Sequence, residues 1–182
     1  AFNADMIDGN GERSGGTEEI TTDRLEQCAM VVEILNLIQP KKIIATFGTG
    51  YHTGSAEDFE KTVLESNKLN FKTEFSAIES HAFFRTGGVL FSMKHHIGTS
   101  SIPHGRASAL LREGMWNALL AEIEQEPRAD VIVRSHAHYY MQVDDGNRLG
   151  FILPALQGRG TKYGARRCSG ATAFGIVTMN CE

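Results

Sequence analysis

Two histidines one residue apart follow an apolar run in the segment DVIVRSHAHYY, residues 130–140. His136 and His138 stand at positions i and i+2, and in an extended backbone such side chains point to the same side. Both imidazoles could then bind one metal ion, or two ions held about 3.5–4 Å apart, as in two-metal hydrolysis of phosphoesters. The alternative interpretation is a pair of exposed loop histidines.

Three other apolar runs also end in carboxylates or imidazoles. The residues are Asp5 and Asp8 after the first run, His52 in the Gly-rich segment GTGYHTG (48–54), and His95 and His96 after VLFSMK (89–94). In open α/β sheets, sites form at the carboxyl ends of the strands. Four such ends therefore predict a site that is assembled from loops.

Each of these residues also has a purely structural interpretation. A carboxylate at a strand end can bridge two cations, but Asp8 before Gly9 is equally typical of a turn. Adjacent histidines in a strand point to opposite faces, so we expect at most one of His95 and His96 to bind a metal. His52 could act as a general acid or as a phosphate donor, or it could be incidental to a tight glycine turn.

Further histidines and arginines carry weaker signals. We expect His81 to pack in a strand rather than to react. Arg106, close to His104, could hold a phosphate oxygen, although a solvated arginine is as common. Arg166 and Arg167 are typical of a solvated loop.

The composition describes one domain that can bury a core, with 182 residues of which 41% are hydrophobic. The net charge of −4 provides no basic field for non-specific binding to nucleic acid or to an anionic membrane. No apolar run approaches the roughly 18 residues of a membrane helix. Cys28, Cys168 and Cys181 show neither CxxC spacing nor a disulfide framework. We therefore expect reduced thiols, with Cys28 in the core, and a cytoplasmic protein.

The hydrophobic pattern predicts helices that alternate with strands, followed mainly by strands. The helices are expected over 22–38, from Ser55 onward and over 107–124. The strands are expected over 1–4, 41–47, two or three stretches within 70–96 with a turn at Gly87-Gly88, 129–135, a hairpin around Asp145-Gly146, and 171–180. This order indicates an α/β sheet with an antiparallel flank.

The same periodicity assigns an inner face to each helix. The residues expected to be buried are Leu25, Ala29, Val32, Leu35 and Ile38 in the first helix, Phe59, Val63 and Leu64 in the second, and Leu111, Met115, Leu119 and Ile123 in the third. Thr22 is the expected N-cap of the first helix, and Ser55 with Asp58 resembles a capping box at the second.

Taken in order, these motifs resemble those of the calcineurin-like metallophosphoesterases. NADMIDG (3–9) is similar to the family's GDxxD motif, with Ala4 in place of the glycine. MKHHIG (93–98) is similar to its lone-histidine segment. RSHAHY (134–139) is similar to GHxH, with Ser135 in place of the glycine.

The segment FGTGYHTG (47–54) stands where the family has its GNH[DE] motif. Gly48 matches, Thr49 replaces the metal-binding asparagine, and the histidine is displaced to His52. This GTxxHxG form is similar to a variant in phage and prophage-encoded members. The family's DxH motif, which supplies two metal ligands, is not present, so the resemblance implies a chain truncated at its N-terminus.

The resemblance implies a fold and a set of site residues. The expected fold is α/β, a calcineurin-like four-layer αββα sandwich with mixed sheets that lacks the first strand, as a single domain over residues 1–182. The implied metal ligands are Asp5, bridging both ions, His136 with His95 or His96 on one ion, and His138 on the other. The implied catalytic residues are Asp5 and His52, the substrate-binding residues are Thr49, His52 and Arg106, and Asp8 would hold the loop.

The implied activity is hydrolysis of a phosphate mono- or diester by a water that two divalent cations activate. The ligands suit Mn, Fe, Zn or Mg without distinguishing among them. The implied partner is a phosphoester substrate. Nucleic acid is expected only as a substrate, and no membrane is expected as a partner. The expected location is the cytoplasm or, for a phage-encoded protein, the host cytoplasm. One alternative is a degenerate, non-catalytic relative with a structural or partner-binding role, for example in a phage assembly. Another is an unrelated α/β domain with scattered histidines.

Overall fold

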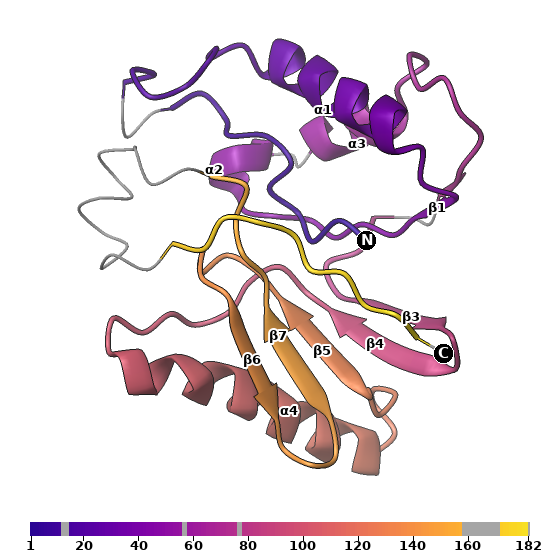
Figure 1. Cartoon of the computed structure of the whole chain (residues 1–182), viewed down its shortest axis with the longest axis vertical. Coiled ribbons are helices and arrows are strands. Elements are labelled where there is room, and N and C mark those ends of the chain that lie inside the picture. Colours follow the sequence, from indigo (N-terminus) through magenta and orange to yellow (C-terminus); the bar gives the residue numbers. More distant parts are fainter. Residues whose placement is uncertain (12–14, 56–57, 76–77, 158–171, 182) are drawn as a thin grey trace. The chain divides into compact units, whose positions relative to one another are not determined.

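The computed structural model of the chain describes residues 1–11, 15–55, 58–75, 78–157 and 172–181. The chain forms two compact units, Ala1–Ser80 (unit 1) and His81–Glu182 (unit 2). Figure 1 labels their helices and strands. Both units combine helices with strands, and unit 2 holds a mixed sheet, so the predicted α/β class is confirmed. The single domain over residues 1–182 and the four-layer arrangement stay predictions.

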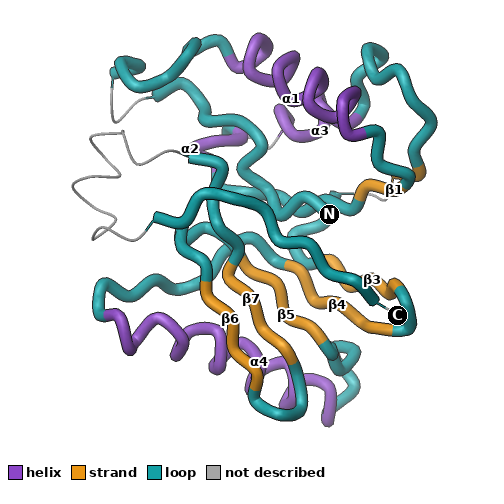
Figure 2. Tube along the Cα trace, viewed as in Figure 1, coloured by secondary structure: helices purple, strands orange, loops and turns teal. Residues whose placement is uncertain are grey.

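The described residues of unit 1 form short strands and three helices. Strand β1 (Lys42–Ile43) pairs in parallel with β2 (Glu74–Phe75), and single bridges join Phe2 to Ala45 and Thr46 to Glu79. The helices are α1 (Arg24–Ile38), α2 (Gly50–Thr53) and α3 (Asp58–Leu64). Loops make up much of this unit (Figure 2). The predicted strand segments 1–4 and 41–47 are therefore present as brief pairings.

The N-cap of helix α1 lies one residue later than expected. Asp23, not Thr22, occupies the N-cap, where its side chain accepts N–H groups of Leu25 and Glu26 at 2.8 and 3.4 Å. A carboxylate also interacts favourably with the positive end of the helix dipole. The prediction of Thr22 as the cap was wrong.

The inner face of α1 was predicted only in part. The buried residues are Gln27, Cys28, Val32 and Leu35. Leu25 and Ile38, which were expected to be buried, are 63% and 59% exposed. Gln27 turns inward because its amide binds a neighbouring loop, and this sets the rotation of the helix. In α3, Val63 and Leu64 are buried and Phe59 packs against the same core, as predicted. The side chain of Asp58 lies outside the described residues, so the capping box stays a prediction.

Unit 2 contains a five-stranded mixed sheet in the order β3-β4-β5-β7-β6 (Figure 1). The strands are β3 (Ala82–Thr86), β4 (Val89–Met93), β5 (Val131–Arg134), β6 (Met141–Asp144) and β7 (Leu149–Ile152). The three inner strands run parallel and the two edge strands pair antiparallel. All four residues of β5 are buried, as is typical of a central parallel strand. The predicted turns at Gly87-Gly88 and Asp145-Gly146 are both confirmed.

Helix α4 (Arg106–Glu122) follows the 3₁₀ helix η1 (Pro103–Gly105) and covers one face of this sheet. The prediction of its inner face was wrong. Leu111, Met115, Leu119 and Ile123 are 47%, 57%, 51% and 62% exposed, respectively. The buried residues of α4 are instead Leu110, Gly114 and Asn117.

The reversed orientation of α4 follows from close packing and from buried hydrogen bonds. Leu110 lies over Gly150 of β7, where a Cβ atom would come within 2.9 Å of the leucine side chain. Gly114 leaves room for the side chain of Arg148, which donates to its carbonyl. Asn117 accepts the Ala129 N–H at 2.9 Å, which satisfies a buried backbone donor. Small and polar residues therefore decide this face, and the larger apolar side chains point outward.

The last predicted strand, residues 171–180, was also wrong over its described part. One bridge joins Ala155 to Phe174, and the pairing ends at Gly175. Phe174 and Ile176 are 72% and 76% exposed. A glycine inside an extended segment weakens pairing, and neither flanking apolar side chain gains burial from it.

Every helix in the described parts of the chain is too short or too polar to cross a membrane. Cys28 is a free, buried thiol, as predicted for a core position, and Cys181 is also free. Burial raises the pKa of the Cys28 thiol. Cys168, Arg166 and Arg167 lie outside the described residues.

Candidate functional site

In unit 1, Asp5 lies in a strained loop directly after the bridge at Phe2. Ala4 and Asp5 have φ angles of 65° and 49°, in the left-handed region that residues other than glycine rarely adopt. Ala4 occupies the position where the resembling family motif has glycine, and a positive φ is the conformation that favours glycine. The backbone is therefore bent sharply to present the Asp5 carboxylate.

The Asp5 carboxylate is held at the start of α2. Its Oδ1 accepts the Thr49 N–H at 2.8 Å, and the Thr49 hydroxyl lies 3.4 Å from the same oxygen. Thr49 is the N-cap residue of α2 but makes no side-chain cap hydrogen bond. Backbone N–H groups that bind a carboxylate stabilise its charged form.

Gly48 allows this approach because it has no side chain. A Cβ atom at Gly48 would clash with Oδ1 of Asp5 and come within 2.7 Å of the Asp5 backbone nitrogen. Real Cβ atoms essentially never approach a backbone atom so closely. The glycine that matches the family motif is thus required by the position of the carboxylate.

His52, on α2, lies between two carboxylates. Its Nδ1 is 2.8 Å from the Asp8 carbonyl oxygen and 3.8 Å from Asp8 Oδ1, and its Nε2 is 3.9 Å from Asp5 Oδ2. Because a carbonyl oxygen only accepts hydrogen bonds, Nδ1 carries a proton and donates it to Asp8. Nε2 is then the nitrogen that can gain or release a proton. The role of His52 as a general acid stays a prediction.

Gln27 holds the loop that carries Asp8, a role that was expected of Asp8 itself. Its Oε1 accepts the N–H groups of Asp8 and Gly9 at 2.9 and 3.0 Å, and its Nε2 donates to the carbonyls of Gly9 and Thr21, each at 2.7 Å. The Asp8 carboxylate instead faces His52. A glutamine within a helix gave no sequence signal for this role.

In unit 2, His95 and His136 follow the neighbouring parallel strands β4 and β5. Backbone pairing continues past both strands, since Lys94 N–H donates to Val133 O at 3.2 Å and Ser135 N–H donates to His95 O at 2.9 Å. The two rings are 5.4 Å apart between centroids with planes at 74°. One ring nitrogen of each lies within 4.8 Å of the other. Adjacent strand ends thus bring two imidazoles from distant sequence positions to metal-binding separation.

His95 and His96 differ sharply in burial. His95 is 4% exposed, whereas His96 is exposed and its ring lies 4.6 Å from that of His136. Their opposite environments match the expectation that the two side chains point to opposite faces. The buried position of His95, where its rotamers are restricted, favours it over His96 as a metal ligand.

The backbone around His136 and His138 is not extended, although the expectation that both side chains point to the same side assumed an extended backbone. Their φ angles are 65° and 56°, so each residue turns the chain sharply. The carbonyl of His138 accepts the Ala173 N–H at 3.0 Å. The i, i+2 spacing therefore does not fix the direction of the His138 side chain, whose role as a ligand stays a prediction.

A buried arginine stands directly before this histidine segment. Arg134, 2% exposed, donates through Nη1 to the carbonyls of Ser92 and Val133 at 3.1 and 2.9 Å, and pairs with Glu113 of α4 at 3.0 Å. Burial lowers the pKa of its guanidinium, and the charge of Glu113 opposes this. Arg134 thereby ties together the ends of β4 and β5 and anchors them to α4.

His81 extends this network, in agreement with the expectation that it packs. Its Nε2 lies 2.8 Å from the Ser92 hydroxyl, and its Nδ1 lies 3.5 Å from Glu126. Burial lowers the pKa of His81, and Arg134 lowers it further. Ser92 is fully buried, so this serine, histidine and glutamate constellation is structural rather than nucleophilic.

Arg106 and His104 lie beside the start of α4. The guanidinium of Arg106 is 4.7 Å from the centre of the Tyr139 ring, a separation typical of a cation–π contact. Burial raises the pKa of Tyr139, while Arg106 and a backbone hydrogen bond with Ser100 oppose the rise. His104 is exposed. The predicted contact of Arg106 with a phosphate stays a prediction.

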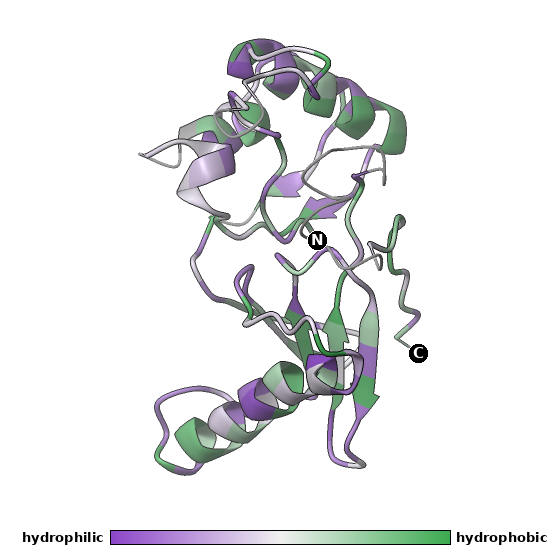
Figure 3. Cartoon of the chain, turned by 90° about the vertical axis from the view of Figure 1, so that its left-hand side faces the viewer, coloured by the Kyte–Doolittle hydropathy of each residue, from purple (hydrophilic) through white to green (hydrophobic). Residues whose placement is uncertain are grey.

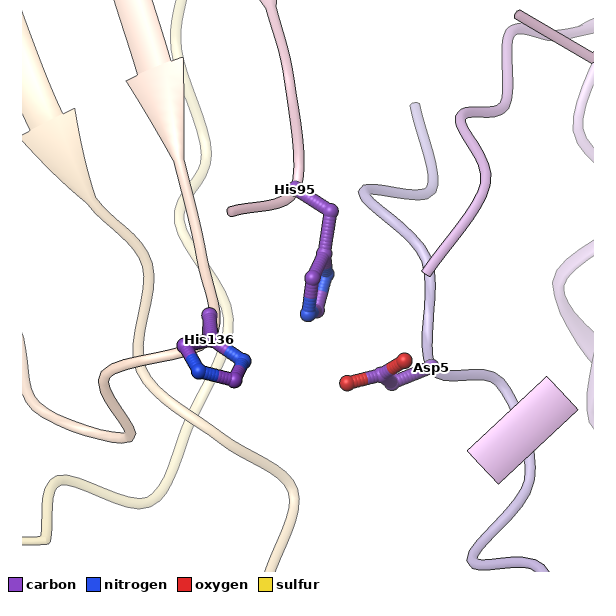
Figure 4. A group of neighbouring side chains, drawn as sticks. All are labelled: Asp5, His95 and His136. Atoms are coloured by element: carbon purple, nitrogen blue, oxygen red, sulfur yellow. The ribbon is translucent and has the colours of Figure 1, made fainter. Parts of the chain in front are cut away.

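Figure 4 draws three of the predicted ligands as sticks. The two imidazoles, His95 and His136, come from the segments that follow β4 and β5 of unit 2, and the carboxylate comes from the Asp5 loop of unit 1. Imidazole nitrogens and carboxylate oxygens form a donor set that suits Zn, Fe or Mn. The two imidazoles of unit 2 therefore suit a divalent transition metal.

No family model and no curated protein matches the sequence. Among solved structures, the chain is similar to wild-type Vps29 of Entamoeba histolytica complexed with Zn²⁺, with 14% identity, a TM-score of 0.39 and coverage of 71% of this chain. The match spans only 65% of the Vps29 chain. The chain is also similar to an archaeal phosphodiesterase, with 16% identity, a TM-score of 0.44 and coverage of 78% of this chain and 83% of that one.

Proposed function

We propose that the chain is a metal-dependent phosphoesterase. The observation that carries this proposal is the pair of imidazoles, His95 and His136, which lie at the ends of adjacent parallel strands with ring nitrogens within 4.8 Å. Two imidazoles so close together, one of them 4% exposed, are an arrangement typical of metal ligands. The order of motifs, which resembles that of the calcineurin-like metallophosphoesterases, supports the same assignment.

Asp5 supplies the carboxylate of this proposed centre. Its Oδ1 is fixed by the Thr49 N–H, so the geometry of the carboxylate is set within unit 1 before any metal binds. A carboxylate can bridge two cations and offset their mutual repulsion. In the proposal, Asp5, His95, His136 and His138 would hold the ions.

Two divalent cations, when bound, polarise the phosphoryl oxygens and lower the pKa of a water that attacks the phosphorus. His52 keeps its Nδ1 proton on the Asp8 carbonyl and uses Nε2 to deliver a proton to the leaving oxygen. Asp5 Oδ2 lies 3.9 Å from this Nε2. Thr49 and Arg106 contribute hydrogen bonds to the phosphoryl group in this proposal.

The proposed substrates are phosphate mono- or diesters, with nucleic acid only as a substrate because the net charge is −4. The spacing of Gly48, Thr49 and His52 supports a phage-type variant of the family as part of the same proposal. The proposed ions are Mn, Fe, Zn or Mg. A cytoplasmic location belongs to the proposal as well.

A non-catalytic role is the second candidate, and the position of Thr49 favours it. Its hydroxyl lies 3.4 Å from Asp5 Oδ1, where the family motif has an asparagine whose amide oxygen binds metal. A neutral hydroxyl is the weaker ligand. A chain that binds a single ion this way would serve as a structural or partner-binding module, for example in a phage assembly.

Hydrolysis assays separate the two candidates. Purified chain supplied with Mn is expected to hydrolyse bis-p-nitrophenyl phosphate or p-nitrophenyl phosphate, and His136→Ala is expected to lower kcat/KM by about 10³-fold or more, because several kcal/mol of charge stabilisation are lost. The exposed His104 offers a matched control, since His104→Ala should leave turnover unchanged. Unchanged turnover in His136→Ala would contradict the proposal, and a wild-type chain that binds metal without turnover would favour the second candidate.

A further inference from the structure

Helix α4 and its C-cap residue, Ile123, expose a row of large apolar side chains. Leu111, Met115, Trp116, Leu119 and Ile123 are 47%, 57%, 53%, 51% and 62% exposed. Figure 3 shows hydrophobic residues recurring along the helix between hydrophilic ones. We call these five residues the outer row. At about 1.5 Å per residue, the row runs for roughly 18 Å along the helix axis.

The outer row adds little to the core of unit 2. The helix packs on its own sheet through the opposite side, where Leu110, Gly114 and Asn117 are buried. With roughly 100° between successive residues, the buried and exposed sets lie on opposite faces of the helix. A contiguous apolar surface of this kind is unusual on a monomeric protein and typically marks a binding surface.

Two opposite charges lie within the same exposed face. Arg112 falls near the N-terminal end of the outer row and Glu122 near its C-terminal end, and both are exposed. Three pairs of residues are placed symmetrically about Asn117 in the sequence, since the two members of each pair are equally far from it. These pairs are Arg112 and Glu122, Leu111 and Ile123, and Met115 and Leu119. The face is therefore complementary to itself when one helix is turned end over end.

We propose that the outer row binds a second copy of this chain through an antiparallel, two-fold α4–α4 contact. In such an isologous contact, a residue that precedes the level of Asn117 on one helix meets the residue that follows this level by the same distance on the second helix. Arg112 then faces Glu122 of the second copy twice, while Leu111 packs against Ile123 and Met115 against Leu119. Trp116 lies beside the centre, the position where aromatic residues contribute most to binding energy.

Glu122 has a weak partner within its own chain, Arg128, which competes little with Arg112 of a second copy. Arg128 Nη1 lies 3.8 Å from Glu122 Oε1, and the two side chains are 59% and 74% exposed. Exposed pairs of this type contribute little because solvent screens them. Exchange of this partner for Arg112 of a second copy is therefore inexpensive, and the surrounding apolar side chains strengthen the new pair by excluding water.

Charge reversal tests both the occupant and its orientation. Sedimentation velocity over about a hundredfold concentration range should show a reversible monomer–dimer equilibrium for the wild-type chain. R112E and E122R should each weaken dimerisation by about tenfold or more, since each places like charges opposite one another twice. The double variant R112E/E122R should restore the wild-type dissociation constant to within about threefold, because the pairs are re-formed in reverse. W116A should abolish the dimer.

A matched apolar control lies in unit 1. Leu37 on α1 is 85% exposed, and Leu37→Ala should leave dimerisation unchanged. Circular dichroism of each variant should match wild type, because every substituted side chain is at least half-exposed or charged at the surface. A wild-type chain that stays monomeric at all concentrations, or binds a different protein through this face without self-association, overturns the proposal. If the double variant R112E/E122R dimerises as weakly as the single variants, the antiparallel pairing is overturned.

Discussion

Unit 1 and unit 2 position their reactive side chains by different means. In unit 2, His95 and His136 follow two neighbouring parallel strands whose backbone pairing continues up to the histidines. In unit 1, Asp5 follows a single bridge and a bent backbone, and its position depends on Gly48 and on the Thr49 N–H. Loops therefore do in unit 1 what a sheet does in unit 2.

The contrast shows where each half of the proposed site is vulnerable. Many backbone hydrogen bonds hold the strands of a sheet in place, so a single substitution on a strand has little effect on their position. The residue of unit 2 that is most sensitive to substitution is therefore Arg134, which carries a buried charge. A strained loop has few such bonds, and its weak point is the space that a missing Cβ atom leaves at Gly48. One substitution in each unit tests this difference.

The larger effect is expected in unit 2. Arg134→Met should lower the free energy of unfolding by about 3 kcal/mol, because it leaves two carbonyls and Glu113 without their buried donor. Urea unfolding followed by circular dichroism measures the change.

The matched control is Arg85, an exposed arginine on β3 that donates to Gly88 O at 2.6 Å. Arg85→Met should cost less than about 0.5 kcal/mol, as is usual for surface substitutions. A loss below about 1 kcal/mol in Arg134→Met would mean that the sheet ends do not depend on this arginine.

A smaller but more local effect is expected in unit 1. Gly48→Ala should displace the Asp5 carboxylate and lower phosphodiester hydrolysis by about tenfold or more, with an unfolding cost of about 1–2 kcal/mol from overpacking. Steady-state kinetics and urea unfolding together provide the measurement. Gly50, also in this segment, has open space around its missing Cβ, so Gly50→Ala serves as the control. Equal kinetics for the two variants would show that the close approach at Gly48 does not position Asp5.

The sequence was sufficient to predict the parts that obey strong local rules. The hairpin turns needed glycines with positive φ, and the pairs Gly87-Gly88 and Asp145-Gly146 supply them. The buried strand β5 was evident from its continuous apolar run, and His136 was singled out because that run ends beside it. His95 was found by the same reasoning, although its preference over His96 required the observed burial.

The remaining features depend on packing that no local pattern encodes. The buried face of α4 is marked only by Leu110, Gly114 and Asn117, whereas its larger apolar side chains are exposed, so hydrophobic periodicity predicted the wrong face. Gln27 acts on a loop 18 residues away, and nothing in its local sequence indicates this. Arg134 did carry a signal, since a charged residue inside a buried strand is expected to be paired.

The most direct test of the central claim is to measure Mn binding by titration calorimetry on the wild-type chain, Asp5→Ala, His136→Ala and the double variant. If Asp5 of unit 1 and His136 of unit 2 bind the same centre, each single substitution should weaken binding by about 100-fold or more, and the double variant should lose much less than the sum of the two effects. Mn affinity that is unchanged in Asp5→Ala while it falls in His136→Ala would contradict a shared metal centre.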